Sequence, residues 1–164
     1  MPSAAFRLAL FGAFVALAPA VAANVPPAAA RAADSLPVSA RGAAATVDAF
    51  HAALRRGDTK AAASLLAEDA LIFEGGGVER SKAEYMAHHL PADAEFSKSV
   101  PSVMTRRSGG SNGMLAWVAS EGRTTGTFRG KPLDRVTAET MLLRRVGRGW
   151  KNTHIHRSSA AKGQ

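Results

Sequence analysis

Apolar residues in the first half of the chain recur at helical spacing. Residues 43–56 carry one apolar stripe made of Val47, Phe50 and Leu54. Gly57 follows directly, at the position where glycine commonly ends a helix because it adopts positive φ without strain. The pattern therefore predicts an amphipathic helix over residues 43–56.

Two more helices and one strand are expected before Pro91. Residues 60–66 fit a short helix, and residues 70–73 (ALIF) fit a short strand followed by a glycine turn. Residues 81–90 fit a helix whose first four residues, Ser-Lys-Ala-Glu, form a capping box. Pro91 is expected to end that helix, because the residue before a proline disfavours helical geometry.

The second half of the chain has the pattern of strands joined by glycine-rich turns. Strands are expected over 99–107, 114–128, 135–145 and 150–158. Helices followed by an antiparallel meander predict an α+β domain, in which the helices cover one face of a curved sheet.

The N-terminus has the features of a secretory signal peptide. Arg7 gives a positive start, residues 8–17 are apolar, and small residues offer cleavage after Ala22 or Ala23. We therefore expect a periplasmic or secreted protein, with an uncleaved anchor as the alternative. The predicted organisation is a signal peptide over 1–23, a flexible Ala- and Pro-rich leader over 24–41, a folded domain over 42–159 and a tail over 160–164.

Composition narrows the chemistry that the domain can perform. The 164 residues are 46% hydrophobic and 21% charged, as expected for one globular domain. The absence of cysteine excludes disulfides, thiolate nucleophiles and Cys-ligated metals. The formal net charge is +8, yet the basic residues lie in short pairs and no nucleic-acid motif is present. We expect no nucleic-acid partner, no cofactor, and no membrane span after signal cleavage.

Three segments in a fixed order carry a family resemblance. A helix-forming segment at 47–54 precedes a short helix and strand over 57–70, then comes SKAEYMAHHL at 81–90, and GWKNTHIHRS covers 149–158. This order resembles the nuclear transport factor 2-like superfamily in its SnoaL-like branch. The last segment also resembles the association domain of calcium/calmodulin-dependent kinase II.

The resemblance implies a cone-shaped fold. In such a fold a strongly bent antiparallel sheet wraps around helices, with a pocket at the wide end and dimers or larger homo-oligomers built through the outer face of the sheet. It does not imply one function, because the superfamily includes isomerases, dehydratases, cyclases, carriers and assembly domains. Trp117 and Phe128 are candidates either for the outer face or for the core.

A histidine–glutamate pair is the leading candidate for catalysis. His154 and His156 lie two residues apart on a strand, so they share one face. If residues 146–149 form a four-residue hairpin loop, His154 lies opposite Met141 and His156 lies opposite Glu139. This register predicts either an acid–base pair or a structural pair inside the cone. A slip of one residue would place Glu139 on the other face.

The remaining candidates are a ligand pocket and a metal site. His156 is expected to face the interior and to matter more than His88 or than His51, which we place on an exposed helix flank. No spacing of histidines or acidic residues requires a metal site, so no metal is predicted. The expected pocket residues are Tyr85, His89, Asn152, Met141 and Glu74.

Three functions follow from these candidates. The first is an exported, oligomeric domain that binds an unidentified small molecule without catalysis. The alternative is an isomerase, dehydratase or cyclase that uses Glu139 and His156, and the third is a periplasmic His-rich metal binder. An open cavity with both groups exposed to it favours the enzyme, whereas a filled cone interior favours a structural pair.

Overall fold

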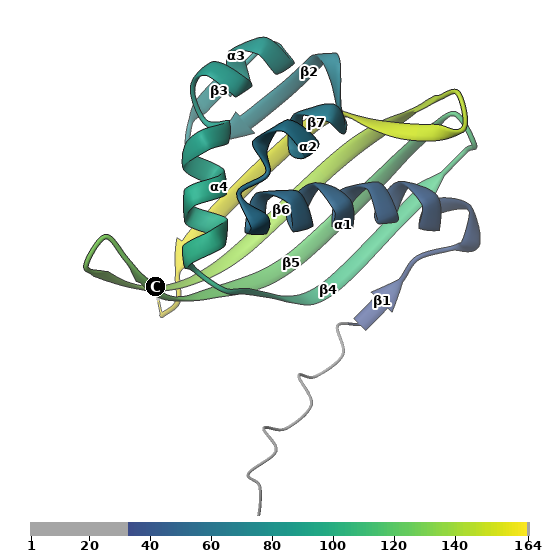
Figure 1. Ribbon diagram of the computed structural model, residues 1–164. Coiled ribbons are helices and arrows are strands. Elements are labelled where there is room, and N and C mark those ends of the chain that lie inside the picture. Colours follow the sequence, from purple (N-terminus) through teal and green to yellow (C-terminus); the bar gives the residue numbers. More distant parts are fainter. Residues whose placement is uncertain (1–32, 164) are drawn as a thin grey trace, which may run out of the picture.

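The computed structural model describes residues 33–163, which form four α-helices, one short 3-10 helix and seven strands (Figure 1). The predicted signal peptide and the start of the predicted leader lie outside these residues. The elements in chain order are β1 (Ala33–Ser35), η1 (Val38–Ala40), α1 (Arg41–Arg56), α2 (Thr59–Ser64), β2 (Leu66–Glu74), β3 (Gly77–Glu79), α3 (Lys82–Ala87), α4 (Leu90–Ser99), β4 (Ser102–Ser111), β5 (Leu115–Phe128), β6 (Lys131–Val146) and β7 (Gly149–Ala161).

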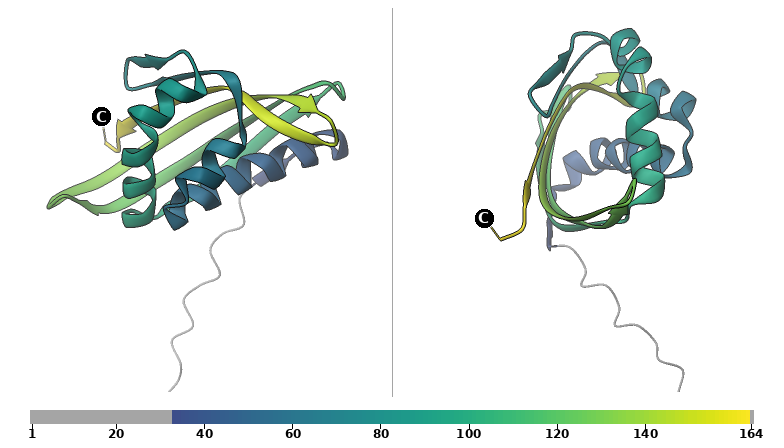
Figure 2. Two further views of the ribbon diagram at one scale, coloured as in Figure 1. Left: turned by 45° about the horizontal axis from the view of Figure 1, so that its top comes forward. Right: turned by 90° about the vertical axis from the view of Figure 1, so that its left-hand side faces the viewer.

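All strands belong to one sheet in the order β1-β4-β5-β6-β7-β2-β3. The long strands β4 to β7 pair antiparallel, whereas β2 runs parallel to β7 at one side and β1 runs parallel to β4 at the other. The sheet bends so strongly that it curls around α1, while α4 lies across the open side (Figure 2). The predicted α+β fold with a curved sheet is confirmed.

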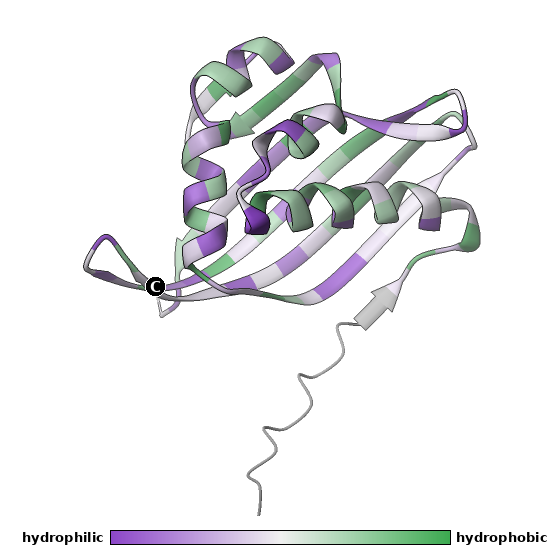
Figure 3. Ribbon diagram, viewed as in Figure 1, coloured by the Kyte–Doolittle hydropathy of each residue, from purple (hydrophilic) through white to green (hydrophobic). Residues whose placement is uncertain are grey.

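The core lies between α1 and the concave face of the sheet. The predicted stripe of Val47, Phe50 and Leu54 is fully buried, as are Met141 and Ile155 on the facing strands. Hydrophobic residues run along α1 and β2, whereas α4 carries several hydrophilic positions (Figure 3). Each large side chain buried here contributes about 1.5–3 kcal/mol relative to exposure, so this stripe fixes where α1 sits.

Two predicted helix ends are present. Gly57 ends α1 with φ of 73°, in the left-handed region. The Ser81 hydroxyl accepts a hydrogen bond from the Glu84 backbone N–H at 3.1 Å and caps α3.

The helix predicted over 81–90 is two helices. α3 ends at Ala87, and α4 begins at Leu90 with Pro91 in its first turn. Proline is tolerated there because the first backbone N–H groups of a helix have no partner within the helix. Pro91 therefore starts a helix that the sequence interpretation missed.

The described part of the predicted leader is structured. β1 pairs with β4. Leu36 packs over Gly109, and a Cβ atom added to Gly109 would lie only 2.5 Å from the Leu36 Cδ2 atom. At the other end of the domain, β7 extends to Ala161, into the predicted tail. None of the helices in residues 33–163 is long and apolar enough to cross a membrane.

Candidate functional site

The hairpin between β6 and β7 starts in the predicted register and then departs from it. Arg145 lies opposite Trp150, as predicted. The register shifts by one residue between Leu142 and Leu143, beside Thr153. A bulge of this kind sets two residues of one strand against one residue of its partner.

The bulge overturns the predicted pairing of Glu139 with His156. Beyond it, Glu139 lies opposite Arg157, and His156 lies opposite Thr140. Glu139 keeps the predicted inward position, but His156 is exposed on the outer face. The prediction that His156 faces the cone interior beside Glu139 is therefore wrong.

The bulge has a cause in the sequence. Trp150 and Ile155 are both buried, although they are five residues apart. Strict alternation would place residues at an odd separation on opposite faces of the strand. One extra residue, Thr153, allows both to face the core, and its hydroxyl donates to the Leu142 carbonyl at 3.1 Å.

Arg157 takes the interior position that the prediction gave to histidine. Its Nε donates to Glu139 Oε2 at 2.8 Å, and its Nη1 donates to Asp93 Oδ2 at 2.7 Å and to Glu74 Oε2 at 3.0 Å. The Tyr85 hydroxyl donates to the same Asp93 oxygen at 2.5 Å. We call Arg157, Glu139, Asp93, Glu74, Tyr85 and His51 the Arg157 cluster.

His51 completes the Arg157 cluster from α1. Its Nε2 lies 2.8 Å from Glu139 Oε1, and its side chain is only 29% exposed. His51 follows Val47 by four residues and precedes Leu54 by three, so it lies beside the buried stripe. The expectation of an exposed flank is wrong, although this spacing was visible in the sequence.

The opposite charges of the Arg157 cluster stabilise one another in their ionised forms. Burial alone would raise the pKa of Glu139, but the facing His51 and Arg157 lower it to about 2. Burial alone would lower the pKa of Arg157, but the surrounding carboxylates of Glu139, Asp93 and Glu74 raise it well above its ordinary value. Burial also raises the pKa of Tyr85, so its hydroxyl stays protonated and can donate. Among the residues that the structure describes, the buried Arg157 Nη2 atom has no hydrogen-bond partner.

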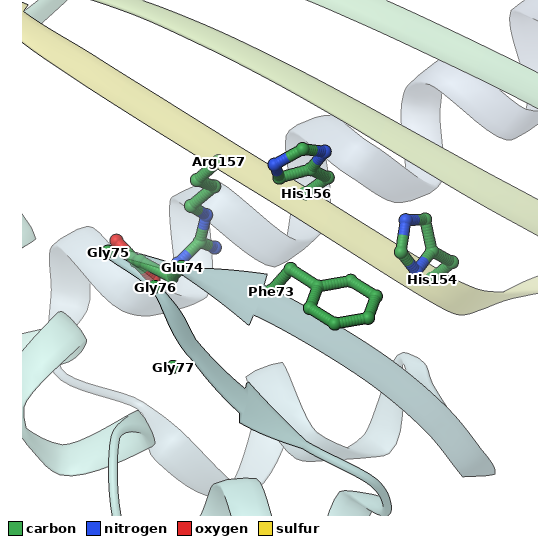
Figure 4. Close-up of a pocket in the computed structure, with 8 residues that line it drawn as sticks. All are labelled: Phe73, Glu74, Gly75, Gly76, Gly77, His154, His156 and Arg157. Carbon is green, nitrogen blue, oxygen red and sulfur yellow. Dashed lines mark hydrogen bonds and ion pairs between the residues drawn. The ribbon is translucent and has the colours of Figure 1, made fainter.

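A pocket of about 390 Å³ opens beside the cluster, where β2 ends in a glycine turn (Figure 4). Glu74, Arg157 and the turn residues Gly75–Gly77 are among its lining residues. The other lining residues come from the outer face of β2 and β7, namely Phe73, His154 and His156. The Phe73 ring contacts the His154 ring edge-on at 5.5 Å and the His156 ring at 6.1 Å, measured between centroids.

The structure separates the predicted pocket residues. Glu74 lines the pocket, and Tyr85 lies behind it in the Arg157 cluster. Met141 and Asn152 are fully buried in the core, away from the lining. His89 pairs with the buried Glu79, and its Cε1 atom lies 3.9 Å from the position that a Cβ atom on Gly77 would take. Of the five predicted pocket residues, Glu74 lines this pocket, whereas Tyr85, Met141, Asn152 and His89 are not among its lining residues.

The remaining candidates fall on two surfaces. Trp117 lies on the outer face of the sheet and is 43% exposed, while Phe128 stacks edge-on against Phe96 of α4.

Within residues 33–163 no three His, Asp or Glu side chains are grouped as a metal site would require.

Comparison with known proteins identifies the domain. Residues 43–162 match the family model of the SnoaL-like domain. A proposed ketosteroid isomerase from Shewanella frigidimarina is 34% identical, covers 76% of this chain and 100% of its own, and superposes with a TM-score of 0.71. A search of curated proteins gives no match.

Two solved structures of lower identity share the fold. One is a proposed calcium/calmodulin-dependent protein kinase II association domain from Xanthomonas campestris, at 22% identity and TM-score 0.64, covering 80% of this chain and 96% of its own. The other is a proposed dehydratase from Streptomyces avermitilis, at 18% identity and TM-score 0.64, covering 74% of this chain and 97% of its own. With the family match over residues 43–162, the chain belongs to the SnoaL-like domain family.

Proposed function

We propose that this chain is an exported, self-associating SnoaL-like domain that binds a small molecule in the pocket beside Arg157. The observation that carries the proposal is the open pocket of about 390 Å³, whose lining combines the rings of Phe73, His154 and His156 with Glu74, Arg157 and the glycine turn. Its volume falls in the range of small-ligand sites, roughly 300–1,000 Å³, and it combines aromatic walls with a few polar groups.

The geometry favours binding over acid–base catalysis by Glu139. Both Glu139 oxygens are engaged, one by His51 and one by Arg157. A carboxylate with a pKa of about 2 is a weak proton acceptor near neutral pH, where an effective catalytic base has a pKa closer to the working pH. The interior around it is filled by the hydrophobic core and the cluster itself.

Ligand binding is tested by thermal unfolding of the purified protein with a panel of small aromatic and aliphatic compounds. A compound that binds only the native state must raise the melting temperature, by an amount that grows with its concentration. Phe73→Ala removes an aromatic wall and should reduce the response, whereas Val103→Ala, on β4 outside the pocket, should leave it unchanged. If no compound stabilises the protein, the binding proposal is wrong.

An isomerase or dehydratase is the second candidate, and the His51–Glu139 pair favours it. The proposed ketosteroid isomerase with 34% identity makes this chemistry worth testing. In that case Glu139 would orient His51, and His51 would move the proton. The test is turnover of a ketosteroid substrate, which His51→Asn should abolish. Absence of turnover in the wild type would remove this candidate.

Export and self-association complete the proposal. The small residues after Leu17 support cleavage after Ala22 or Ala23, so the mature protein should begin at Ala23 or Asn24. Intact-mass measurement on protein recovered from the cell envelope checks this, and a mass that still includes Met1 to Ala22 would contradict it. The names of two structural relatives, an association domain and a kinase hub, support self-association.

A further inference from the structure

One end of the molecule, which we call the tip, is formed by three segments that are far apart in the sequence. They are the corner between β1 and α1 (36–42), the β4–β5 turn (111–116) and the β6–β7 hairpin (144–151). Both turns and the start of α1 lie at the same end of the sheet in two views (Figures 1 and 2). The Arg145 backbone N–H donates to the Met114 carbonyl at 2.8 Å, and Gly42 lies against the Trp150 indole.

The tip is basic. Its three segments contain no Asp or Glu and hold five Lys or Arg residues, namely Arg41, Arg144, Arg145, Arg148 and Lys151. Arg144 pairs with Asp69 of β2. Among residues 33–163, Arg41 and Arg148 are exposed and have no ion pair. The tip therefore presents positive charge that the described part of the chain does not neutralise.

The tip also holds the most exposed apolar side chains of the described residues. Val38, Met114 and Leu115 are 76%, 66% and 59% exposed, more than any other large apolar residue between 33 and 163. Val146 in the third segment is 49% exposed. Exposed apolar residues scattered singly need no explanation, but here each of the three segments brings at least one to the same basic end.

We propose that the tip binds the surface of an anionic phospholipid membrane. The basic side chains would bind lipid phosphates, while Val38, Met114 and Val146 would enter the boundary between the headgroups and the acyl chains. Leu115 lies on the outer face of the sheet, so we leave it out of this set. The long Arg and Lys side chains suit such a boundary, because their apolar stems follow the acyl chains and their charged ends stay among the headgroups.

A membrane fits the tip better than a soluble polyanion. A polyanion would pair with the basic side chains alone and would leave the apolar residues in water. A membrane surface offers anionic groups and an apolar layer side by side, so it matches both features. The proposal is independent of small-molecule binding, because no residue of the tip lines the pocket beside Arg157.

Cosedimentation with vesicles tests the proposal. The full-length protein is mixed with vesicles of phosphatidylcholine, with or without phosphatidylglycerol. We expect at least about tenfold tighter binding to the anionic vesicles, because each basic residue near an anionic surface contributes about fivefold. High salt should remove this preference. Every variant below keeps the apolar residues 8–17, so a difference between variants reports on the tip and not on the N-terminus.

A matched pair of double variants tests the charges. Arg41→Ser with Arg148→Ser should weaken binding to anionic vesicles by about twentyfold, from two contributions of about fivefold each. Arg55→Ser with Arg56→Ser removes the same charge from exposed positions at the other end of α1. That end lies about 20 Å from Arg41, roughly twice the Debye length, so the control should change binding by less than about twofold.

A second matched pair tests the apolar contacts. Val38→Ser with Met114→Ser should weaken binding by about tenfold, because burying even part of each side chain in the membrane contributes that much in total. Val103→Ser with Met86→Ser removes the same two side chains from exposed positions on β4 and α3, outside the tip, and should leave binding unchanged. Thermal unfolding of each variant verifies that it is folded.

Three outcomes would overturn the proposal. Equal binding to neutral and anionic vesicles would show that the basic residues do not select the membrane. Equal losses in the tip variants and their controls would show that another surface is used. A loss with the arginine pair but none with Val38→Ser and Met114→Ser would identify a purely electrostatic site, as expected for a soluble polyanion.

Discussion

At the level of single residues, the imidazole of His51 should contribute more to stability than the imidazole of His156. His51 is a hydrogen-bond partner of the buried Glu139, whereas His156 is exposed on the outer face. Removing one partner leaves the other buried without it, which costs about 1–3 kcal/mol. His51→Ala should therefore lower the free energy of unfolding by that amount, and His156→Ala should stay within about 0.5 kcal/mol.

Urea melts of the two variants check this order. A larger loss in His156→Ala than in His51→Ala would contradict the register of β6 and β7 beyond Thr153. The comparison is informative because one substitution removes an imidazole of α1 that contacts Glu139 on the inner face of the sheet, and the other removes an imidazole from the outer face of β7.

Glu139 should make the stability depend on acid pH. Its pKa falls from 4.5 to about 2 on folding, so the unfolded chain binds the proton more readily. A depressed pKa gives stability that is complete above about pH 5 and is lost as the pH falls toward 2. With about 1.36 kcal/mol per pKa unit, the contribution near pH 7 is on the order of 3 kcal/mol.

Denaturant melts of the wild type and Glu139→Gln measure this dependence. The variant should be less stable at pH 7, and the difference in unfolding free energy should shrink steadily below pH 5. A difference that stays constant down to pH 2.5 would show that the carboxylate charge of Glu139 does not stabilise the fold.

At the level of elements, local patterns predict well where one residue decides the geometry. The stripe on α1 and the cap at Gly57 required only spacing and residue type. Pro91 was predicted to end a helix, but it lies in the first turn of α4. Proline can either follow a helix or begin one, and the local sequence favours neither alternative. Helix α4, which supplies Asp93 to the cluster, was therefore missed.

The β7 strand shows how far one bulge moves a predicted site. The register predicted from the hairpin turn is correct at Trp150. Beyond the bulge, at Ile155, it is wrong by one residue. The odd separation of these two apolar residues indicates a bulge, and using it would have put Arg157 opposite Glu139. The pairing of β2 with β7, which brings Glu74 to Arg157, joins segments about eighty residues apart and leaves no local signal.

At the scale of the whole molecule, the outer face of the sheet carries an apolar patch. Trp117 on β5 lies directly opposite Leu142 on β6, and each is 43% exposed. Leu115, two residues before Trp117 on the same face of β5, is 59% exposed. Clusters of large apolar residues on a soluble domain commonly mark interaction surfaces.

We expect this patch to pair with the same patch of a second copy. A two-fold dimer buries one surface of each subunit against itself, so Leu142→Glu would place a charge near its centre in both subunits at once. The variant should dissociate at high micromolar concentrations where the wild type sediments as a dimer or larger species. Met86→Glu, an equally exposed apolar residue on α3, should leave the assembly intact, because it lies away from the patch. Sedimentation of the wild type as a monomer, or of Leu142→Glu as an unchanged dimer, would show that a different surface is used or that none is.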